Sequence, residues 1–154
     1  MTDNVQAIID HAAQQCKENG ARLTDKRKHI LHGLLQSEKA LSAYELVEYC
    51  KTEFDEIMPA MSVYRILEFL EAEHLVHKLN LANKYIACAH IECLHDHAAS
   101  QFLICQTCQR VKEVDIGDSI YQSLRKNVQE AGFELESPKL EINCICEVCA
   151  SSNT

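Results

Sequence analysis

The stretch SAYELVEYCKTEFDEIMPAMSVYRILEFL, which runs from Ser42 to Leu70, predicts two helices joined by a short turn at Pro59. Ser42 and Glu45 have the spacing of a capping box, in which a hydroxyl and a carboxylate bind unpaired backbone amides at a helix start. Beyond the turn, apolar residues recur at the helical spacing: Val63, Ile66, Leu67 and Leu70. Arg65 falls on the opposite side of that helix and points outward. The pattern indicates a helix-turn-helix, and an ordinary helical bundle with a solvated arginine fits it as well.

The segments on either side extend this unit. Val5 to Cys16 has the apolar spacing of a helix that ends near Gly20, and a second helix is expected to begin at Thr24. Residues 75–88, LVHKLNLANKYIAC, are rich in strand-forming types and contain a turn signal near Asn83. With a two-stranded wing after the helix-turn-helix, the sequence supports a DNA-binding domain as strongly as it supports a plain helical bundle.

The second half of the chain has a different character. FLIC at residues 102–105 predicts a short strand, residues 117–132 predict a helix, and residues 133–146 predict a pair of strands interrupted by Pro138. The chain is therefore expected to have an α+β fold, with an N-terminal winged helix-turn-helix domain and a small C-terminal α/β unit. The boundary between them is expected near residues 82–88.

The composition is that of an ordered, soluble protein. Hydrophobic residues make up 47% of the 154 residues, and no apolar run approaches the roughly 18 residues of a membrane span. The N-terminal residues lack the features of a signal peptide, so a cytoplasmic location is expected. A net charge of −8 argues against indiscriminate binding of nucleic acid and leaves room for a local basic face. Nine cysteines in a reducing compartment predict metal binding or catalysis rather than disulfides.

Two CxxC pairs give the strongest chemical signal. CQTC supplies Cys105 and Cys108, and CEVC supplies Cys146 and Cys149. Four thiolates form a closed tetrahedral zinc site, which stabilises a small domain and leaves no open position for catalysis. A redox CxxC usually occurs singly at a helix start after a βαβ pattern, which this sequence lacks. Cys144 stays unassigned.

A second metal site is predicted in the stretch CAHIECLHDH, which begins at Cys88. Its side chains that can ligate a metal are Cys88, His90, Glu92, Cys93, His95, Asp96 and His97. Mixed nitrogen, sulfur and oxygen ligands suit zinc and disfavour magnesium, calcium or manganese. The HxE of this stretch with a following CxxC is also a feature of zinc deaminases, but Ile104 replaces the proline of that signature. The sequence therefore predicts that the protein is not an enzyme.

Together these motifs resemble those of the ferric uptake regulator superfamily of bacterial metal-responsive repressors, and most closely those of its zinc uptake regulators. The similar segments are RLTDKR at residues 22–27, SAYEL at 42–46, SVYRILEFL at 62–70, VHK at 76–78, ICQTC at 104–108 and ICEVC at 145–149. Asp25 replaces the usual proline and Ser62 the usual threonine. Neither change removes a metal ligand or the outward arginine.

The resemblance implies a zinc-responsive repressor of zinc-uptake genes. It implies a DNA-binding domain at residues 1–82, a hinge at 83–88 and a zinc-containing dimerisation domain at 89–154. The active form would be a zinc-loaded homodimer on a palindromic operator in double-stranded DNA. No organic cofactor is expected.

The resemblance also implies two zinc ions per chain. One would be structural, on the paired cysteines, and the other regulatory. The regulatory ligands carried over from the resemblance are His77, Cys88, His97 and Glu113. His95 is the alternative to His97, and His90 and Cys93 have no clear counterpart.

Arg65 is predicted to contact a base directly, because the two parallel N–H groups of its guanidinium match the two hydrogen-bond acceptors of guanine, O6 and N7. Phosphate or flanking contacts are expected from Ser62, Tyr64, Tyr44, Arg27 and Lys26. Two alternatives remain open at this point. One is an iron- or peroxide-responsive regulator of the same superfamily, and the other is a zinc-thiolate redox protein that uses Cys93 and Cys144.

Overall fold

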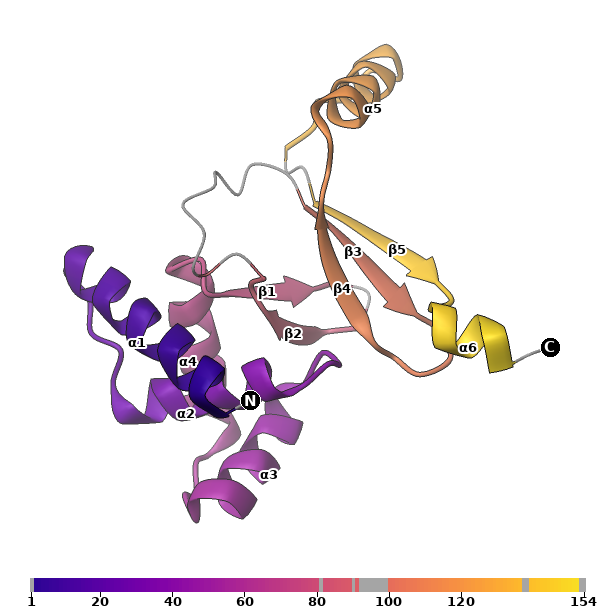
Figure 1. Ribbon diagram of the computed structural model, residues 1–154. Coiled ribbons are helices and arrows are strands. Elements are labelled where there is room, and N and C mark those ends of the chain that lie inside the picture. Colours follow the sequence, from indigo (N-terminus) through magenta and orange to yellow (C-terminus); the bar gives the residue numbers. More distant parts are fainter. Residues whose placement is uncertain (1, 81, 90, 92–99, 137–138, 153–154) are drawn as a thin grey trace. The chain divides into compact units, whose positions relative to one another are not determined.

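The computed structural model describes residues 2–80, 82–89, 91, 100–136 and 139–152. The chain forms two compact units, Met1–Leu94 and His95–Thr154 (Figure 1). In the described part of the chain, no helix has the length and apolar character that a membrane crossing requires.

The first unit contains four helices and a hairpin. The helices are α1 (Thr2–Glu18), α2 (Asp25–Gln36), α3 (Ala43–Phe54) and α4 (Ala60–Ala72). The predicted capping box is confirmed, because Ser42 Oγ accepts a hydrogen bond from Glu45 N at 3.1 Å and Ser42 N donates to Glu45 Oε1 at 3.4 Å. These two bonds satisfy backbone amides at the start of α3, which sets the first residue of the helix-turn-helix.

The apolar sides of the four helices form one core. Fully buried members include Ala12 of α1, Ile30 and Leu31 of α2, Leu46 of α3 and Leu67 of α4. The residues that helical spacing predicts to face inward on α4 do so: Val63, Leu67 and Leu70 are buried and Ile66 is half-buried. Arg65 is exposed on the other side of the helix, as predicted.

The predicted wing is present as an antiparallel hairpin of β1 (Val76–Leu79) and β2 (Lys84–Ala87). Asn83 closes it with a left-handed backbone at φ 50°, a conformation that asparagine tolerates better than most residues. Leu41, just before α3, adds a bridge to Tyr85 through two backbone hydrogen bonds of 2.9 and 2.8 Å. This bridge fixes the wing to the start of the helix-turn-helix.

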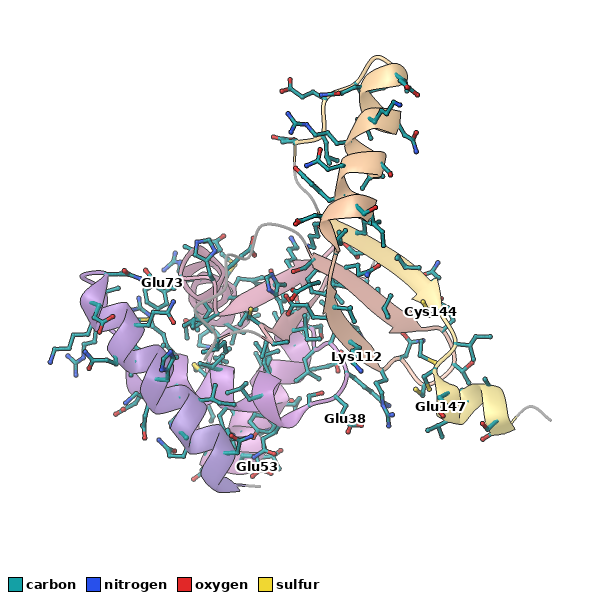
Figure 2. All side chains as sticks on the ribbon, turned by 45° about the horizontal axis from the view of Figure 1, so that its top comes forward. Glu38, Glu53, Glu73, Lys112, Cys144 and Glu147 are labelled. Carbon is teal, nitrogen blue, oxygen red and sulfur yellow. The ribbon has the colours of Figure 1, made fainter. Side chains whose placement is uncertain are left out.

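The second unit is a three-stranded sheet with the order β4-β3-β5. β3 (Ser100–Cys105) pairs antiparallel with β4 (Val111–Asp115) and parallel with β5 (Lys139–Cys144). The crossover from β4 to β5 contains α5 (Asp118–Glu130), which extends beyond the strand ends in Figure 1, and α6 (Glu147–Ser152) follows β5. Lys112 projects from β4 and Cys144 from β5 (Figure 2).

Three details differ from the predictions. Residues 133–136 were expected in a strand and form none, because β3 already has a partner on each side and this segment pairs with neither. β4 was not predicted, since VKEVD places charged residues between its valines. The chain divides between Leu94 and His95, later than the hinge expected at 83–88, because most of that segment is strand β2 and Ile91 belongs to the first core.

Candidate metal centre and DNA-binding residues

The paired cysteines meet because β3 and β5 are parallel and in register. Cys105 ends β3 opposite Cys144, the last residue of β5, so the two CxxC segments leave the sheet at the same edge. Cys108 lies in the tight turn after β3, where Gln109 adopts φ 67°. Cys146 precedes α6 and Cys149 lies within it. Parallel strands present their carboxyl ends at one edge, which converts two distant sequence motifs into one cluster.

The four sulfur atoms have the spacing of a tetrahedral zinc site. They all lie within 4.8 Å of one another, and Cys108 Sγ is 3.7 Å from Cys146 Sγ. Zinc–sulfur bonds of about 2.3 Å at tetrahedral angles place the sulfurs about 3.8 Å apart, whereas a disulfide requires about 2.05 Å. The cluster therefore fits a Cys₄ metal centre and not a pair of disulfides.

Local hydrogen bonds already favour thiolates in this cluster. Backbone N–H groups of Cys108 and Cys146 lower the pKa of Cys105 to about 5, and the bond from Cys146 N to Cys105 Sγ is 3.3 Å. The backbone N–H of Cys149 lowers the pKa of Cys146 in the same way. By contrast, a side-chain hydrogen bond with Cys146 raises the pKa of Cys149 to about 12, because this bond stabilises the protonated Cys149 thiol beside the neighbouring sulfur atoms. A divalent cation would favour the thiolate instead, so the donor set suits zinc.

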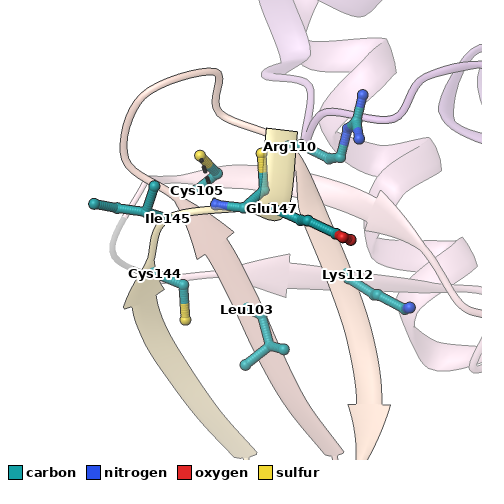
Figure 3. A pocket seen from close by; sticks show the side chains of 8 residues that line it. Leu103, Cys105, Arg110, Lys112, Cys144, Ile145 and Glu147 are labelled. Carbon is teal, nitrogen blue, oxygen red and sulfur yellow. Dashed lines mark hydrogen bonds between the residues drawn. The ribbon is translucent and has the colours of Figure 1, made fainter. Parts of the chain in front are cut away.

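Cys144 lies next to this cluster and outside it. It lines a pocket with Leu103, Cys105, Arg110, Lys112, Ile145, Cys146 and Glu147 (Figure 3). Figure 3 shows its sulfur pointing away from that of Cys105. Cys16 and Cys50 are poorer candidates for metal ligands than Cys144. Both are buried in the first core, and burial raises the pKa of both thiols, that of Cys50 to about 11. Buried neutral thiols of this kind act as core residues.

The predicted regulatory ligands are described in part. His77 on β1 is half-buried, Cys88 directly after β2 is buried, and their ligand atoms lie within 4.8 Å of each other. The hairpin accounts for this approach, because β1 and β2 are paired and Cys88 N donates to Leu75 O at 2.9 Å. Glu113 of the second unit lies on β4 and accepts a hydrogen bond from Ser100 Oγ at 3.1 Å.

Four of the predicted metal ligands fall outside the described residues. They are His90, Cys93, His95 and His97. Their roles stay predictions, and so does the choice between His95 and His97.

The predicted DNA-binding residues divide into outward and packed side chains. Arg65 and Lys26 are exposed, and Tyr44 is 66% exposed at the start of α3. Among the described residues, Arg65 has no hydrogen-bond or ion-pair partner. Ser62 and Tyr64 are half-buried, and Tyr64 packs against the core. Contact of any of them with DNA stays a prediction.

Arg27 has a role within the first unit that the sequence did not reveal. Its guanidinium lies 3.7 Å from the centre of the Phe69 ring on α4 and donates to Arg22 O at 2.6 Å. A planar guanidinium over an aromatic face is a favourable cation–π arrangement. Arg27 therefore ties the start of α2 to α4, whether or not it also contacts phosphate.

Sequence reasoning also left an apolar feature of the first unit unassigned. Three large hydrophobic side chains are exposed at the helix-turn-helix: Tyr44 (66%), Ile57 (82%) and Met61 (65%). The sequence does indicate the exposure of Met61, because this residue stands one helical turn before the outward-facing Arg65 and therefore lies on the same side of the helix.

Comparison with known proteins places this architecture among metal-dependent regulators. A family model described as the ferric uptake regulator family matches residues 18–143. The zinc uptake regulation protein of Escherichia coli (strain K12) is 28% identical over 144 residues, 94% of this chain and 82% of the relative. The ferric uptake regulation protein of Staphylococcus aureus (strain N315) is 30% identical over 141 residues, 86% of this chain and 91% of the relative.

Solved structures show the same likeness. A zinc uptake regulator complexed with zinc and DNA has a TM-score of 0.84 at 26% identity, with 97% of each chain covered. Holo XcZur has a TM-score of 0.77 at 30% identity, with 98% of this chain and 99% of the other covered.

Proposed function

Because the chain belongs to the ferric uptake regulator family, we propose that it is a zinc-responsive, sequence-specific DNA-binding repressor of zinc-uptake genes. The observation that carries the zinc assignment is the pair of His77 and Cys88, with ligand atoms within 4.8 Å of each other on the wing. A thiolate beside an imidazole favours zinc over harder ions. The proposed protein binds and regulates, and it catalyses no reaction.

The DNA-binding role rests on α4. Its buried side holds it in the core while Arg65 faces outward from its second turn. A guanidinium donates two hydrogen bonds to guanine O6 and N7 in the major groove, and this pairing identifies the base. Tyr44 and Lys26 are proposed to contact the flanking backbone, together with Ser62 and Tyr64.

Replacement of Arg65 tests this role directly. Arg65→Ala is expected to weaken binding to the preferred operator by about 1–3 kcal/mol and to relax the base preference at one position of each half-site. Fluorescence anisotropy on the operator and on its single-base variants measures both effects. Lys51→Ala, an exposed cation at the end of α3, is the matched control. An equal loss on every DNA sequence would show that Arg65 contacts phosphate and not a base.

We propose that the two metal sites have different tasks. Cys105, Cys108, Cys146 and Cys149 are proposed to hold a structural zinc that clamps the edge of the small sheet. When bound, such an ion supplies roughly 10–16 kcal/mol, which exceeds what a small core provides alone. Cys108→Ser is expected to unfold the second unit, whereas Cys144→Ser should leave it folded.

The regulatory site is proposed to combine His77 and Cys88 of the first unit with His97 and Glu113 of the second. Ligands from both units would fix the units in one relative orientation, and two recognition helices could then engage one operator. To move a population from roughly 1:99 to 99:1, binding must favour the competent state by about 5.5 kcal/mol. Several direct ligands are sufficient for a preference of that size.

A homodimer is proposed through the second unit, because large hydrophobic side chains are exposed on it and such surfaces often mark an interface. Its exposed hydrophobic side chains are Ile120, Phe133, Ile142, Ile145 and Val148. In addition, every residue of α5 is at least partly exposed, although the helix is amphipathic. A two-fold axis through this unit would present two copies of α4 to a palindromic operator.

Native mass spectrometry before and after a mild chelator tests the metal assignment. Two zinc ions per chain are expected, of which one leaves while the dimer persists and DNA binding is lost. His77→Ala should lose the same ion, whereas His11→Ala, an exposed histidine on α1, should retain it. A single ion that never leaves would refute the regulatory site.

The likeness to a ferric uptake regulation protein supports an alternative, an iron-responsive regulator of the same family. Titration of operator binding with zinc and with ferrous iron, each under a metal buffer, separates the two. Binding that requires iron at free concentrations where zinc is ineffective would favour the alternative.

A further inference from the structure

The large hydrophobic side chains that are exposed on the described part of the first unit all belong to its helix-turn-helix. Tyr44 is the second residue of α3, Met61 is the second residue of α4, and Ile57 lies in the turn between these helices. Single exposed hydrophobic residues are ordinary on protein surfaces. Three of them within one helix-turn-helix indicate that part of this unit is covered when the protein binds its partner.

Met61 has a defined relation to the proposed base reader. It stands four residues before Arg65, so the two side chains lie one above the other on the same face of α4. Both are exposed. Met61 is therefore placed to face the base pair next to the one that Arg65 reads.

Charge limits how much of α4 can enter a groove. Glu68 and Glu71 are exposed on its carboxyl-terminal half, and Glu73 follows at its end (Figure 2). Carboxylates near phosphates are repelled, so the helix is expected to approach DNA with its first two turns. Base contacts in helix-turn-helix proteins come from that same end of the recognition helix. Within those two turns, Met61 and Arg65 are the large exposed side chains.

Building on the DNA-binding function proposed above, we propose that Met61 is a specificity-determining residue that packs against the 5-methyl group of a thymine beside the base pair read by Arg65. The thymine methyl is the one apolar group that the bases present in the major groove. Methionine suits it, because its side chain is flexible, apolar and polarisable. The contact would distinguish thymine from cytosine at a position where Arg65 has no influence.

The test replaces single methyl groups in the DNA. In vitro selection with the zinc-loaded wild-type protein first supplies the preferred palindrome. Each thymine is then replaced by deoxyuridine, and binding is measured by anisotropy. With the wild type and with Met61→Leu, one thymine in each half-site is expected to be sensitive, its replacement weakening binding about three- to fivefold.

With Met61→Gln, thymine and deoxyuridine at that position are expected to bind equally. Leucine, methionine and glutamine have similar helix propensities, so these variants differ in polarity and shape and not in the stability of α4. Circular dichroism and zinc content check that all three proteins are equally folded.

Two results would overturn the proposal. One is a loss of affinity for Met61→Gln that is equal on thymine and deoxyuridine DNA, which would place Met61 on the sugar-phosphate backbone. The other is a deoxyuridine penalty that persists in Met61→Gln, which would assign the methyl contact to another residue. Failure of the DNA-binding function itself would appear earlier and separately, as a selection in which the wild type enriches no sequence.

Discussion

Gly33 on α2 occupies a position where only hydrogen fits against α3. A Cβ at this position would lie 2.8 and 3.0 Å from two ring carbons of Tyr49 and 3.3 Å from Leu46 Cδ2. Non-bonded carbon atoms prefer about 3.5–4.0 Å, so the ring would have to retreat by more than half an ångström. Gly33→Ala is therefore predicted to strain the packing of two helices in the DNA-binding unit.

Two opposing terms determine the size of the effect. Alanine stabilises a helix interior by about 1 kcal/mol relative to glycine. Overpacking a filled core costs about 1–3 kcal/mol. The upper part of that range applies here, because Tyr49 cannot retreat freely: its hydroxyl is 2.7 Å from His32 Nδ1, and its ring meets Phe54 edge-on at 6.1 Å. The net prediction is a loss of about 1–2 kcal/mol, and each kcal/mol corresponds to about 4–8 °C in Tm for a domain of this size.

A double-mutant cycle isolates the clash. Urea unfolding followed by circular dichroism gives the free energy of unfolding for wild type, Gly33→Ala, Tyr49→Leu and the double variant. Leucine lacks Cε1 and the hydroxyl, and its Cδ1 can rotate away from the added Cβ because no hydrogen bond to His32 holds the side chain in place. Gly33→Ala should therefore become stabilising in the Tyr49→Leu background, where the helix-propensity gain remains. A single Gly33→Ala variant that is as stable as the wild type, or more so, would refute the reasoning.

Two further predictions concern contacts within the first unit. Arg27→Leu removes the stacking of the guanidinium on Phe69, so it should destabilise this unit by about 0.5–1 kcal/mol. Thermal unfolding measures the loss. An unchanged Tm would mean that Arg27 acts in DNA binding alone. Burial raises the pKa of Glu45, but hydrogen bonds from Lys84 and Ser42 outweigh it and lower that pKa overall. Glu45 therefore stabilises the fold above the ordinary glutamate pKa of about 4.3, and this contribution is lost as the pH falls through the lower folded-state pKa. The Glu45 carboxylate is half exposed, so its contribution to stability is small. Glu45→Gln should make the free energy of unfolding fall less steeply at acid pH. An unchanged dependence on pH would contradict the lowered pKa of Glu45.

The parts of the fold that were predicted correctly have local signals. The capping box at Ser42 and the stripe from Val63 to Leu70 each lie within a few residues of the structure that they determine. The wing was predicted from its strand-forming residues and from the turn signal near Asn83, and asparagine is a residue type that tolerates the positive φ found there. Local hydrogen bonds and helix faces can be inferred from a single sequence.

The errors arise where pairing between distant segments decides the outcome. FELE at residues 133–136 alternates as a strand would, but alternation cannot say whether a partner is available, and Phe133 is 73% exposed. Conversely, β4 carries charged residues and forms because β3 offers it an edge. The stacking of Arg27 on Phe69 joins two residues that are far apart in the sequence, so it could not be predicted. The basic residues beside Arg27 in the sequence suggested only a phosphate contact.

The four cysteines of the candidate metal centre were singled out by residue type and spacing, although the geometry of their cluster was not predicted. CxxC spacing identifies a thiolate pair, but only the parallel pairing of β3 with β5 brings Cys105 to Cys146. Cys144 pairs with Cys105 and still lies outside the cluster, because its sulfur points away (Figure 3). The same limit applies to His77 and Cys88, which approach each other through the pairing of the wing. Residue type and spacing thus identify candidate ligands, and the fold determines which of these candidates lie together.

The acidic character of the chain gives the proposed regulation a physical basis. Non-specific DNA affinity comes from neutralised phosphates, and a chain with a net charge of −8 can provide little of it. Affinity must then come from a few directed contacts, such as those proposed for Arg65 and Met61, on both half-sites at once. Contacts of that kind are lost when the two recognition helices are not held at the operator spacing. An acidic regulator therefore retains little DNA affinity without its metal, and a change in metal occupancy becomes a change in operator occupancy.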